Sequence, residues 1–186
     1  MHIPTLHTER LILREQTPDD TEALIAAFAD ENYSRFITRQ RRALSREEAW
    51  LPIAVVAGSW AAMGYGQWIV EERTSGLAVG RIGPWAPAGW PDFEIAWSVF
   101  PQHQGKGFAV EGAVAAVVWA HQALGREYVI HLIDPLNTPS EKVATALGAE
   151  VTGIWKSPLA EEARIWTTRW QKFLETEAYR RYSPPA

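Results

Sequence analysis

Cysteine is absent from the sequence, so a disulfide framework, a thiolate metal site and a cysteine nucleophile are all excluded. Long apolar runs are missing as well. The longest near-apolar stretch, residues 113–120, is far shorter than the roughly 20 residues that a membrane-spanning helix needs. The N-terminus lacks the basic-then-apolar pattern of a secretory signal. A disulfide-free chain without such a signal suits a reducing compartment, and we expect a cytoplasmic protein with no membrane partner.

An excess of positive charge is also missing. Acidic residues number 22 against 18 lysines and arginines, which gives a formal net charge of −4. Domains that bind nucleic acid usually present a basic face, so we do not expect a nucleic-acid partner. The five histidines show no ligand spacing such as H-E-x-x-H, and we therefore expect no metal.

Hydrophobic residues, by contrast, make up 47% of the sequence, enough for a chain of this length to bury one sizeable core. No linker-like segment divides the chain. We expect one domain over residues 1–180, followed by a loose tail over residues 181–186.

The pattern of polar and apolar residues predicts a mixed α/β fold. Strands are expected over residues 9–15, 67–71, 77–82, 93–100, 128–133, 151–155 and 164–170. Helices are expected over residues 17–29, from Ser45 onward, over 110–124 and over 140–147. An apolar strand, an apolar helix and a second apolar strand follow one another over residues 93–133. This order implies one parallel strand pair with a right-handed crossover, while the hairpins elsewhere imply antiparallel pairs.

The most informative segment is a glycine-rich turn between that strand and that helix. It reads Gln104-Gly105-Lys106-Gly107-Phe108-Ala109. The N–H groups at a helix start are free and point outward, and the helix dipole adds positive charge there. Glycines let the backbone approach an anion closely, and Lys106 adds a cation at the rim. The segment therefore predicts a phosphate-binding turn.

Three phosphate motifs compete for this turn. A P-loop, G-x-x-x-x-G-K-[ST], is absent. A dinucleotide fingerprint needs a third glycine or an alanine where Val110 stands. The turn fits R/Q-x-x-G-x-G/A at every position, and in this it resembles the coenzyme A pyrophosphate turn of the GNAT acetyltransferases.

Four further segments extend this resemblance over most of the chain. They are Thr8-Glu9-Arg10-Leu11-Ile12-Leu13-Arg14, the strand segment 94–101, the segment Asn137-Thr138-Pro139-Ser140, and Leu147-Gly148-Ala149. They are similar to T-E-R-L-x-L-R, to E-I-G-Y/W ending in proline, to N-x-x-S and to L-G-F. The chain thus resembles the RimJ/RimL-like branch of the GNAT superfamily, the ribosomal-protein N-terminal acetyltransferases.

The resemblance implies a fold and an activity. The fold is a GNAT fold of mixed α/β type (α+β-like). It has a central, mostly antiparallel sheet of six to seven strands with one splayed parallel pair, flanked by four helices. The activity is acetyl-CoA-dependent N-acetyl transfer, directly to a primary amine of a small molecule or a protein N-terminus. Because GNAT proteins often pair, a homodimer is a candidate assembly.

The resemblance also implies the residues that would hold coenzyme A. Trp97, Ser98 and Val99 would line its pantetheine arm, with Val99 pairing like a missing strand. Asn137 would hydrogen-bond the arm, with Ser140 close by. The pyrophosphate would lie on Gln104, Gly105, Lys106, Gly107, Phe108 and Ala109, with Val110 at the edge.

Candidate catalytic residues are fewer. Glu94 matches a frequent family glutamate, and a partly buried carboxylate has a raised pKa, so it is the first candidate for the base. His131 titrates near neutrality and is the second. Many GNAT enzymes use a tyrosine as the acid, but Ala144 stands at that position. Water could also serve as the base for an amine of low pKa.

The sequence leaves the identity of the acceptor open. Trp85 and Trp90 lie in a loop rich in proline and glycine and are candidates for an aromatic wall around the acceptor. Ala149 replaces the aromatic residue that usually follows L-G in the family. Ribosomal-protein N-termini, other proteins, small amines, amino acids and antibiotics all remain candidates.

Three rival functions remain beside the enzyme. The first is a non-catalytic acyl-CoA sensor or interaction module on the same fold. The second is a nucleotide-dependent oxidoreductase, which Val110 disfavours because the dinucleotide fingerprint needs glycine or alanine at that position. The third is a protein- or RNA-binding domain, and the net charge of −4 counts against its RNA version.

Overall fold

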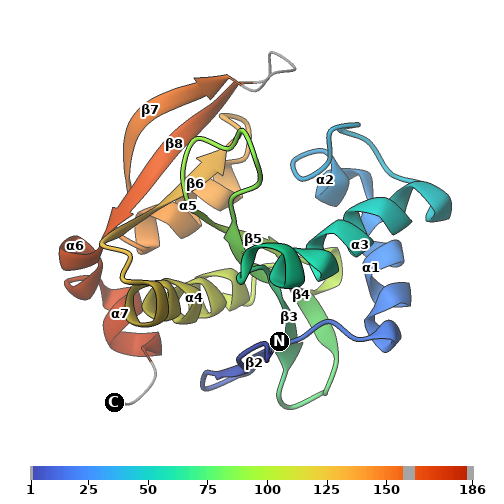
Figure 1. Ribbon diagram of the computed structural model, residues 1–186, viewed down its shortest axis with the longest axis horizontal. Helices are drawn as coiled ribbons and strands as arrows, with labels where there is room; N and C mark the ends of the chain where they lie inside the picture. The colour runs from blue at the N-terminus through green and yellow to red at the C-terminus, as the bar shows by residue number, and fades with distance from the viewer. Residues whose placement is uncertain (1, 157–161, 184–186) are drawn as a thin grey trace.

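One open sheet of eight strands organises the chain in the order β1-β2-β3-β4-β5-β6-β8-β7 (Figure 1). The computed structural model describes residues 2–156 and 162–183. The strands are β1 (Leu6–His7), β2 (Leu11–Arg14), β3 (Trp68–Glu72), β4 (Ala78–Trp85), β5 (Glu94–Val99), β6 (Tyr128–Ile133), β7 (Glu150–Lys156) and β8 (Glu162–Arg169). This mixed α/β sheet confirms the predicted fold class.

Helices cover both faces of the sheet. They are α1 (Thr21–Phe28), α2 (Glu31–Ser34), α3 (Arg46–Met63), α4 (Phe108–Leu124), α5 (Thr138–Ala146), α6 (Trp170–Leu174) and α7 (Glu177–Tyr182), with short 3-10 turns at Pro18–Asp20 and Pro101–His103. Helix α4 packs on β4 and β5, whereas α1 packs on α3. Strand residues alternate between the two faces: Trp68 and Val70 join the core under α4, and Ile69 joins the core under α1 and α3.

The parallel pair is splayed, as expected. Strands β5 and β6 match at one register position only, Glu94 opposite Ile130, and the Ile130 N–H donates to the carbonyl oxygen of Phe93 at 3.0 Å. By contrast, β6 and β8 match at six positions. Beyond Glu94, therefore, β5 diverges from β6 and a gap opens between them.

Local sequence signals set the helix boundaries. The Ser45 side chain and the Glu48 side chain cap each other's backbone N–H groups at the start of α3, as predicted. Pro52 lies inside α3 without ending it. Gly125 ends α4 in the left-handed region at φ 64°, also as predicted. Helix α4 begins at Phe108, two residues before the expected start, because Gly107 is its cap.

The structure corrects several details. The sheet has eight strands rather than six or seven, since the two-residue β1 pairs with β2. Three short helices, α2, α6 and α7, add to the four that were expected. Trp85 ends β4 opposite Glu94 instead of lying in a loop. The first two residues of the expected tail, Arg181 and Tyr182, belong to α7, while residues 184–186 lie outside the described part of the chain.

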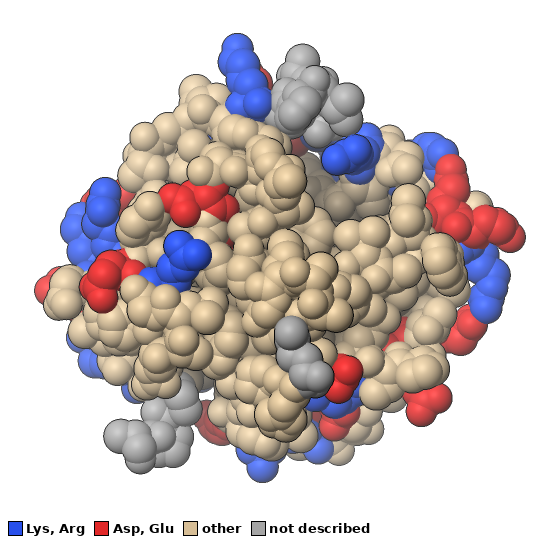
Figure 2. All heavy atoms as spheres, viewed as in Figure 1, with Lys and Arg blue, Asp and Glu red and all other residues tan. Residues whose placement is uncertain are grey.

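The surface carries charges of both signs. On the face shown in Figure 2, acidic and basic side chains gather toward the margin and the centre is uncharged. No helix within residues 2–156 and 162–183 has both the length and the apolar character needed to cross a membrane. The same described residues contain no group of three or more His, Cys, Asp or Glu side chains able to hold a metal ion.

Candidate active site

A cavity of about 580 Å³ lies where β5 and β6 diverge. Its walls come from α1, the loop after α2, α3, strands β4 to β6, the start of α5 and the β7–β8 hairpin. Eight of the predicted site residues line it together: Trp85, Trp90, Glu94, Trp97, Ser98, His131, Asn137 and Ser140. The candidate acceptor residues, the candidate bases and part of the candidate cofactor set therefore share one space.

Glu94 lies on the cavity wall at the point where the two strands separate. Its side chain is 5% exposed. One carboxylate oxygen accepts the backbone N–H of Leu132 at 2.9 Å, and the other accepts the indole N–H of Trp90 at 2.6 Å. Burial raises the pKa of Glu94 to about 7, because the two hydrogen bonds offset only part of the desolvation. This carboxylate therefore exchanges protons at neutral pH.

His131 has a different environment. Its side chain is 1% exposed, and burial lowers the pKa of His131 to about 4. Its Nδ1 is 2.7 Å from the carbonyl oxygen of Ile95, and its Nε2 is 2.9 Å from the Thr168 hydroxyl. Since a carbonyl only accepts, Nδ1 must carry the proton and Nε2 accepts from Thr168. His131 is thus a neutral brace between β5 and β8, with both nitrogens engaged.

The glycine-rich turn has the backbone shape that an anion site requires. Gly105 and Gly107 lie in the left-handed region at φ 77° and 81°, which residues with a Cβ rarely adopt. A Cβ at Gly105 would meet nothing within 4 Å, so this side of the turn is open. The Gln104 side chain donates to the carbonyl oxygen of Val99 at 3.1 Å. This bond ties the turn to the end of β5.

An ion pair between the partly exposed Arg10 and the buried Glu111, which the sequence reasoning missed, braces the turn from behind. Glu111, in the first turn of α4, is fully buried. It accepts hydrogen bonds from the Thr8 hydroxyl at 2.6 Å, from the Arg10 backbone at 2.8 Å and from Arg10 Nε at 2.6 Å. Arg10 also donates to the Lys106 carbonyl oxygen at 3.0 Å. Thr8 and Arg10, at the start of the resemblance, thus fix the turn in space.

The end of β5 offers backbone groups to the gap. The carbonyl oxygens of Ile95 and Val99 both point away from β4, toward the His131 and Gln104 side chains that donate to them. Because backbone groups alternate in direction along a strand, Trp97 points its N–H and C=O the same way. A strand edge of this kind can pair with the amide groups of a ligand as it would with an added strand.

The Asn137 and Ser140 pair begins α5 beside this edge. Asn137 Oδ1 accepts the Ser140 N–H at 3.3 Å and caps the helix. The Ser140 hydroxyl accepts the indole N–H of Trp97 at 3.3 Å, which places this pair within reach of a ligand on β5. Ala144, which stands where many GNAT enzymes have a tyrosine, is fully buried.

Indole rings form one wall of the cavity. Trp85 and Trp90 meet edge to face with ring centres 6.4 Å apart, and Trp90 and Trp155 meet at 4.9 Å. Trp155 comes from β7 and was not among the predicted residues. A wall of this kind favours an apolar or aromatic part of a ligand.

Arg81, on β4, also lines the cavity and was missed. No local pattern marks it, because a single arginine in a strand usually faces solvent. Here its side chain is only 5% exposed.

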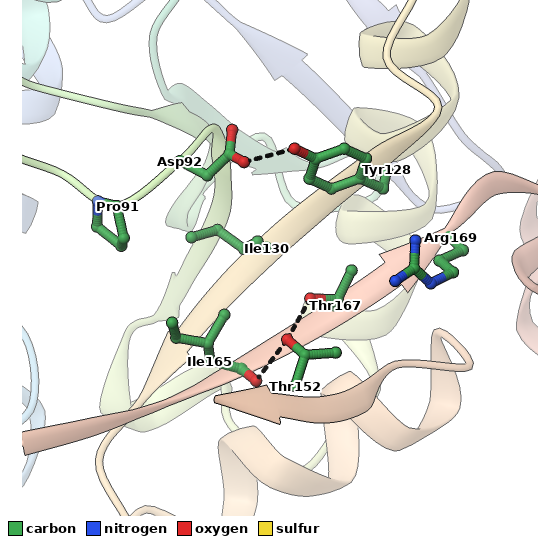
Figure 3. Close-up of a pocket in the computed structure, with 8 residues that line it drawn as sticks. All are labelled: Pro91, Asp92, Tyr128, Ile130, Thr152, Ile165, Thr167 and Arg169. Carbon is green, nitrogen blue, oxygen red and sulfur yellow. Dashed lines mark hydrogen bonds between the residues drawn. The ribbon is translucent and has the colours of Figure 1, made fainter. Parts of the chain in front are cut away.

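A second cavity, of about 420 Å³, lies along β6 and β8. Figure 3 shows its lining, in which Tyr128 donates to Asp92 at 2.6 Å and the Thr152 and Thr167 hydroxyls are bonded at 2.7 Å. It contains none of the predicted site residues. Pro91 and Asp92 link it to the loop whose Trp90 lines the first cavity.

Comparisons with known proteins bear on this site. The family described as acetyltransferase (GNAT) domain matches residues 10–150. The uncharacterized N-acetyltransferase YoaA of Bacillus subtilis is 27% identical over 166 residues, covering 89% of this chain and 93% of its own. A crystal structure of an acetyltransferase from Agrobacterium tumefaciens is 25% identical, with a TM-score of 0.78 over 90% of this chain and 95% of that one.

A third likeness concerns the fold alone. RimL, a ribosomal L7/L12 alpha-N-protein acetyltransferase solved in complex with coenzyme A, is 13% identical. It superimposes with a TM-score of 0.72 over 89% of this chain and 98% of its own.

Proposed function

The chain belongs to the acetyltransferase (GNAT) domain family and is an acyltransferase, and on this premise we propose that it transfers the acetyl group of acetyl-CoA to a primary amine. One observation carries the proposal. At the gap between β5 and β6, a buried glutamate with a pKa of about 7 lies beside a strand edge that β6 leaves unpaired. The fold likeness to RimL and the four matched segments support a place in the RimJ/RimL-like branch.

Residues of this chain would hold acetyl-CoA in two places. The left-handed Gly105 and Gly107 open the α4 N-terminus to the pyrophosphate, and the dipole of this 17-residue helix favours the negative charge. The Trp97 and Val99 backbone would pair with the pantetheine arm. Asn137 would donate its amide N–H to the arm, because its oxygen is engaged as the helix cap. Acetyl-CoA supplies the acetyl group as an activated thioester.

Glu94 would supply the base. The amine nitrogen forms a bond to the acetyl carbon, and the carbon–sulfur bond breaks. The proton that the amine releases passes to Glu94, directly or through one water, and the departing sulfur takes up a proton from solvent. A backbone N–H near Val99, on the edge of β5 that faces the gap, would stabilise the negative charge that develops on the acetyl oxygen. Above pH 7 most of the Glu94 side chains are ionised and can accept the proton.

An assay with a panel of primary amines tests this proposal. The purified protein, acetyl-CoA and each amine are incubated together, while thiol release is recorded and product mass is measured. We expect at least one amine to gain a single acetyl group with release of one equivalent of thiol. Tight acetyl-CoA binding without transfer to any amine would instead favour an acyl-CoA sensor on the same fold.

A further inference from the structure

A buried positive charge lies in the wall of the main cavity without an anionic partner. Arg81 is 5% exposed, and neither its Nε nor its Nη1 has a hydrogen-bond partner. Over residues 2–156 and 162–183 it forms no ion pair. Its guanidinium lies over the Phe28 ring, 5.3 Å from the ring centre, and a hydrogen bond with the Tyr33 side chain opposes the lowering of the Arg81 pKa by burial.

Such a cation requires an explanation. Arginine stays protonated even when burial lowers its pKa, as it does here. An unpaired buried charge is costly, and folds rarely keep one without a compensating partner. Asp134, another acid on the cavity wall, is paired with Arg41. The cavity wall therefore supplies a charge that a ligand anion can neutralise.

The position of Arg81 relative to Glu94 sets the shape of that ligand. Arg81 is the register partner of Ser98, and Glu94 precedes Ser98 by four residues on the same strand face. At about 3.3 Å per residue, the backbone positions of Arg81 and Glu94 are roughly 13 Å apart along the strand direction. The β5 backbone at Trp97, which would pair with the pantetheine arm, lies between them. The indole wall of Trp85, Trp90 and Trp155 adjoins the Glu94 end.

We infer that the acceptor is an amino-carboxylate, an α-amino acid with an aromatic or large apolar side chain, whose carboxylate pairs with Arg81 while its side chain packs on the indole wall. The amine then lies between the two ends, within reach of Glu94. This inference rests on the proposed function and narrows its substrate class. A carboxylate supplies the negative charge that compensates the Arg81 guanidinium, whereas a neutral peptide carbonyl would leave that charge uncompensated.

Matched pairs of amines test it, each pair differing only in the carboxylate. The pairs are phenylalanine with phenethylamine, leucine with isopentylamine, and methionine with 3-(methylthio)propylamine. Phenylalaninamide adds a neutral carbonyl, which stands for a peptide N-terminus. We expect kcat/KM to favour the carboxylate member roughly 10- to 100-fold in at least one pair, as for a hydrogen bond to a charged group, with phenylalaninamide close to phenethylamine.

Arg81→Met should remove this preference, bringing the ratio within a pair close to one. Arg46→Met is the matched control, because it deletes an arginine that pairs with Glu22 on the exposed surface, and it should keep the ratio. Since Met replaces an uncompensated buried cation, the variant should fold at least as stably as the parent. If it does not fold, the preference in the parent protein is measured by direct binding of phenylalanine and phenethylamine, using calorimetry.

Two results would overturn the inference. One is a parent protein that acetylates or binds the decarboxylated amine as well as the amino acid in every pair. The other is an Arg81→Met variant that keeps the full preference. Both results differ from failure of the proposed function, in which no amine releases thiol from acetyl-CoA. In that case, direct binding of the amino acid still tests the role of Arg81.

Discussion

Glu94→Gln should slow the reaction without preventing coenzyme binding. Glutamine keeps the size of the side chain but cannot take a proton. A general base contributes roughly 10²- to 10⁴-fold to a rate, and we expect kcat at pH 8 to fall by about 100-fold. Coenzyme affinity should change little, because Glu94 lies at the far end of β5 from the glycine-rich turn.

The pH profile gives the sharper test. With a pKa of about 7, the parent protein should lose about tenfold in rate per pH unit below 7, because the protonated carboxyl cannot act as a base. The variant should lack this limb. Rates are measured from pH 5.5 to 9 by thiol release at saturating amine, with folding checked by circular dichroism. A variant within twofold of the parent at pH 8, with the same acid limb, would refute the assignment of Glu94.

The folding stability of the parent protein should fall as the pH rises, whereas its rate should rise. The pKa of Glu94 is raised from 4.5 in the unfolded chain to about 7 in the folded one. Its contribution is therefore complete below pH 4.5 and is lost as the pH rises through 7, an effect of about 3 kcal/mol. Glutamine removes this loss but leaves one of the two donors facing an amide N–H, which costs about 1–3 kcal/mol. Urea denaturation at pH 5 and pH 8 should show a smaller pH difference in the variant.

Three further variants test other parts of the site. Gly107→Glu should lower acetyl-CoA affinity at least 100-fold in calorimetry, because it puts negative charge and bulk at the turn. Gly125→Glu is the control: Gly125 is also left-handed but lies at the opposite end of α4, so this variant should bind acetyl-CoA as the parent does. Arg10→Met should lower the free energy of unfolding by about 3–5 kcal/mol in urea, because it leaves the carboxylate of Glu111 buried and unpaired; an unchanged midpoint would contradict this. Burial lowers the pKa of His131 to about 4, so its contribution to stability is present above pH 6.5 and is lost as the pH falls toward 4. His131→Asn should therefore reduce the loss of folding free energy between pH 6.5 and pH 4. If urea titrations of parent and variant show the same dependence on pH, the ring is not a buried neutral brace.

Short-range patterns explain what the sequence could predict. The turn, its two glycines and the start of α4 follow from adjacent residues, and so does the capping box of α3. Glu94 could be singled out because it matches a glutamate that is frequent in the family it resembles. The splay between β5 and β6 followed from the family resemblance.

The missed residues depend on contacts between distant segments. Arg81 looks like an ordinary strand arginine until Phe28 and Tyr33 close over it. Trp155 comes from β7 and reaches the loop of Trp90 only once β7 and β8 have joined the sheet. His131 could be placed on a strand, but its burial depends on the spacing of β5 and β8, which no local pattern encodes.

The most direct test of the central claim is a calorimetric titration of the purified protein with acetyl-CoA, using NADH and ATP as controls. We predict saturable binding of acetyl-CoA at one site per chain, with no comparable heat from NADH or ATP. A folded protein that binds no acetyl-CoA, or that binds NADH as well as acetyl-CoA, would contradict the account.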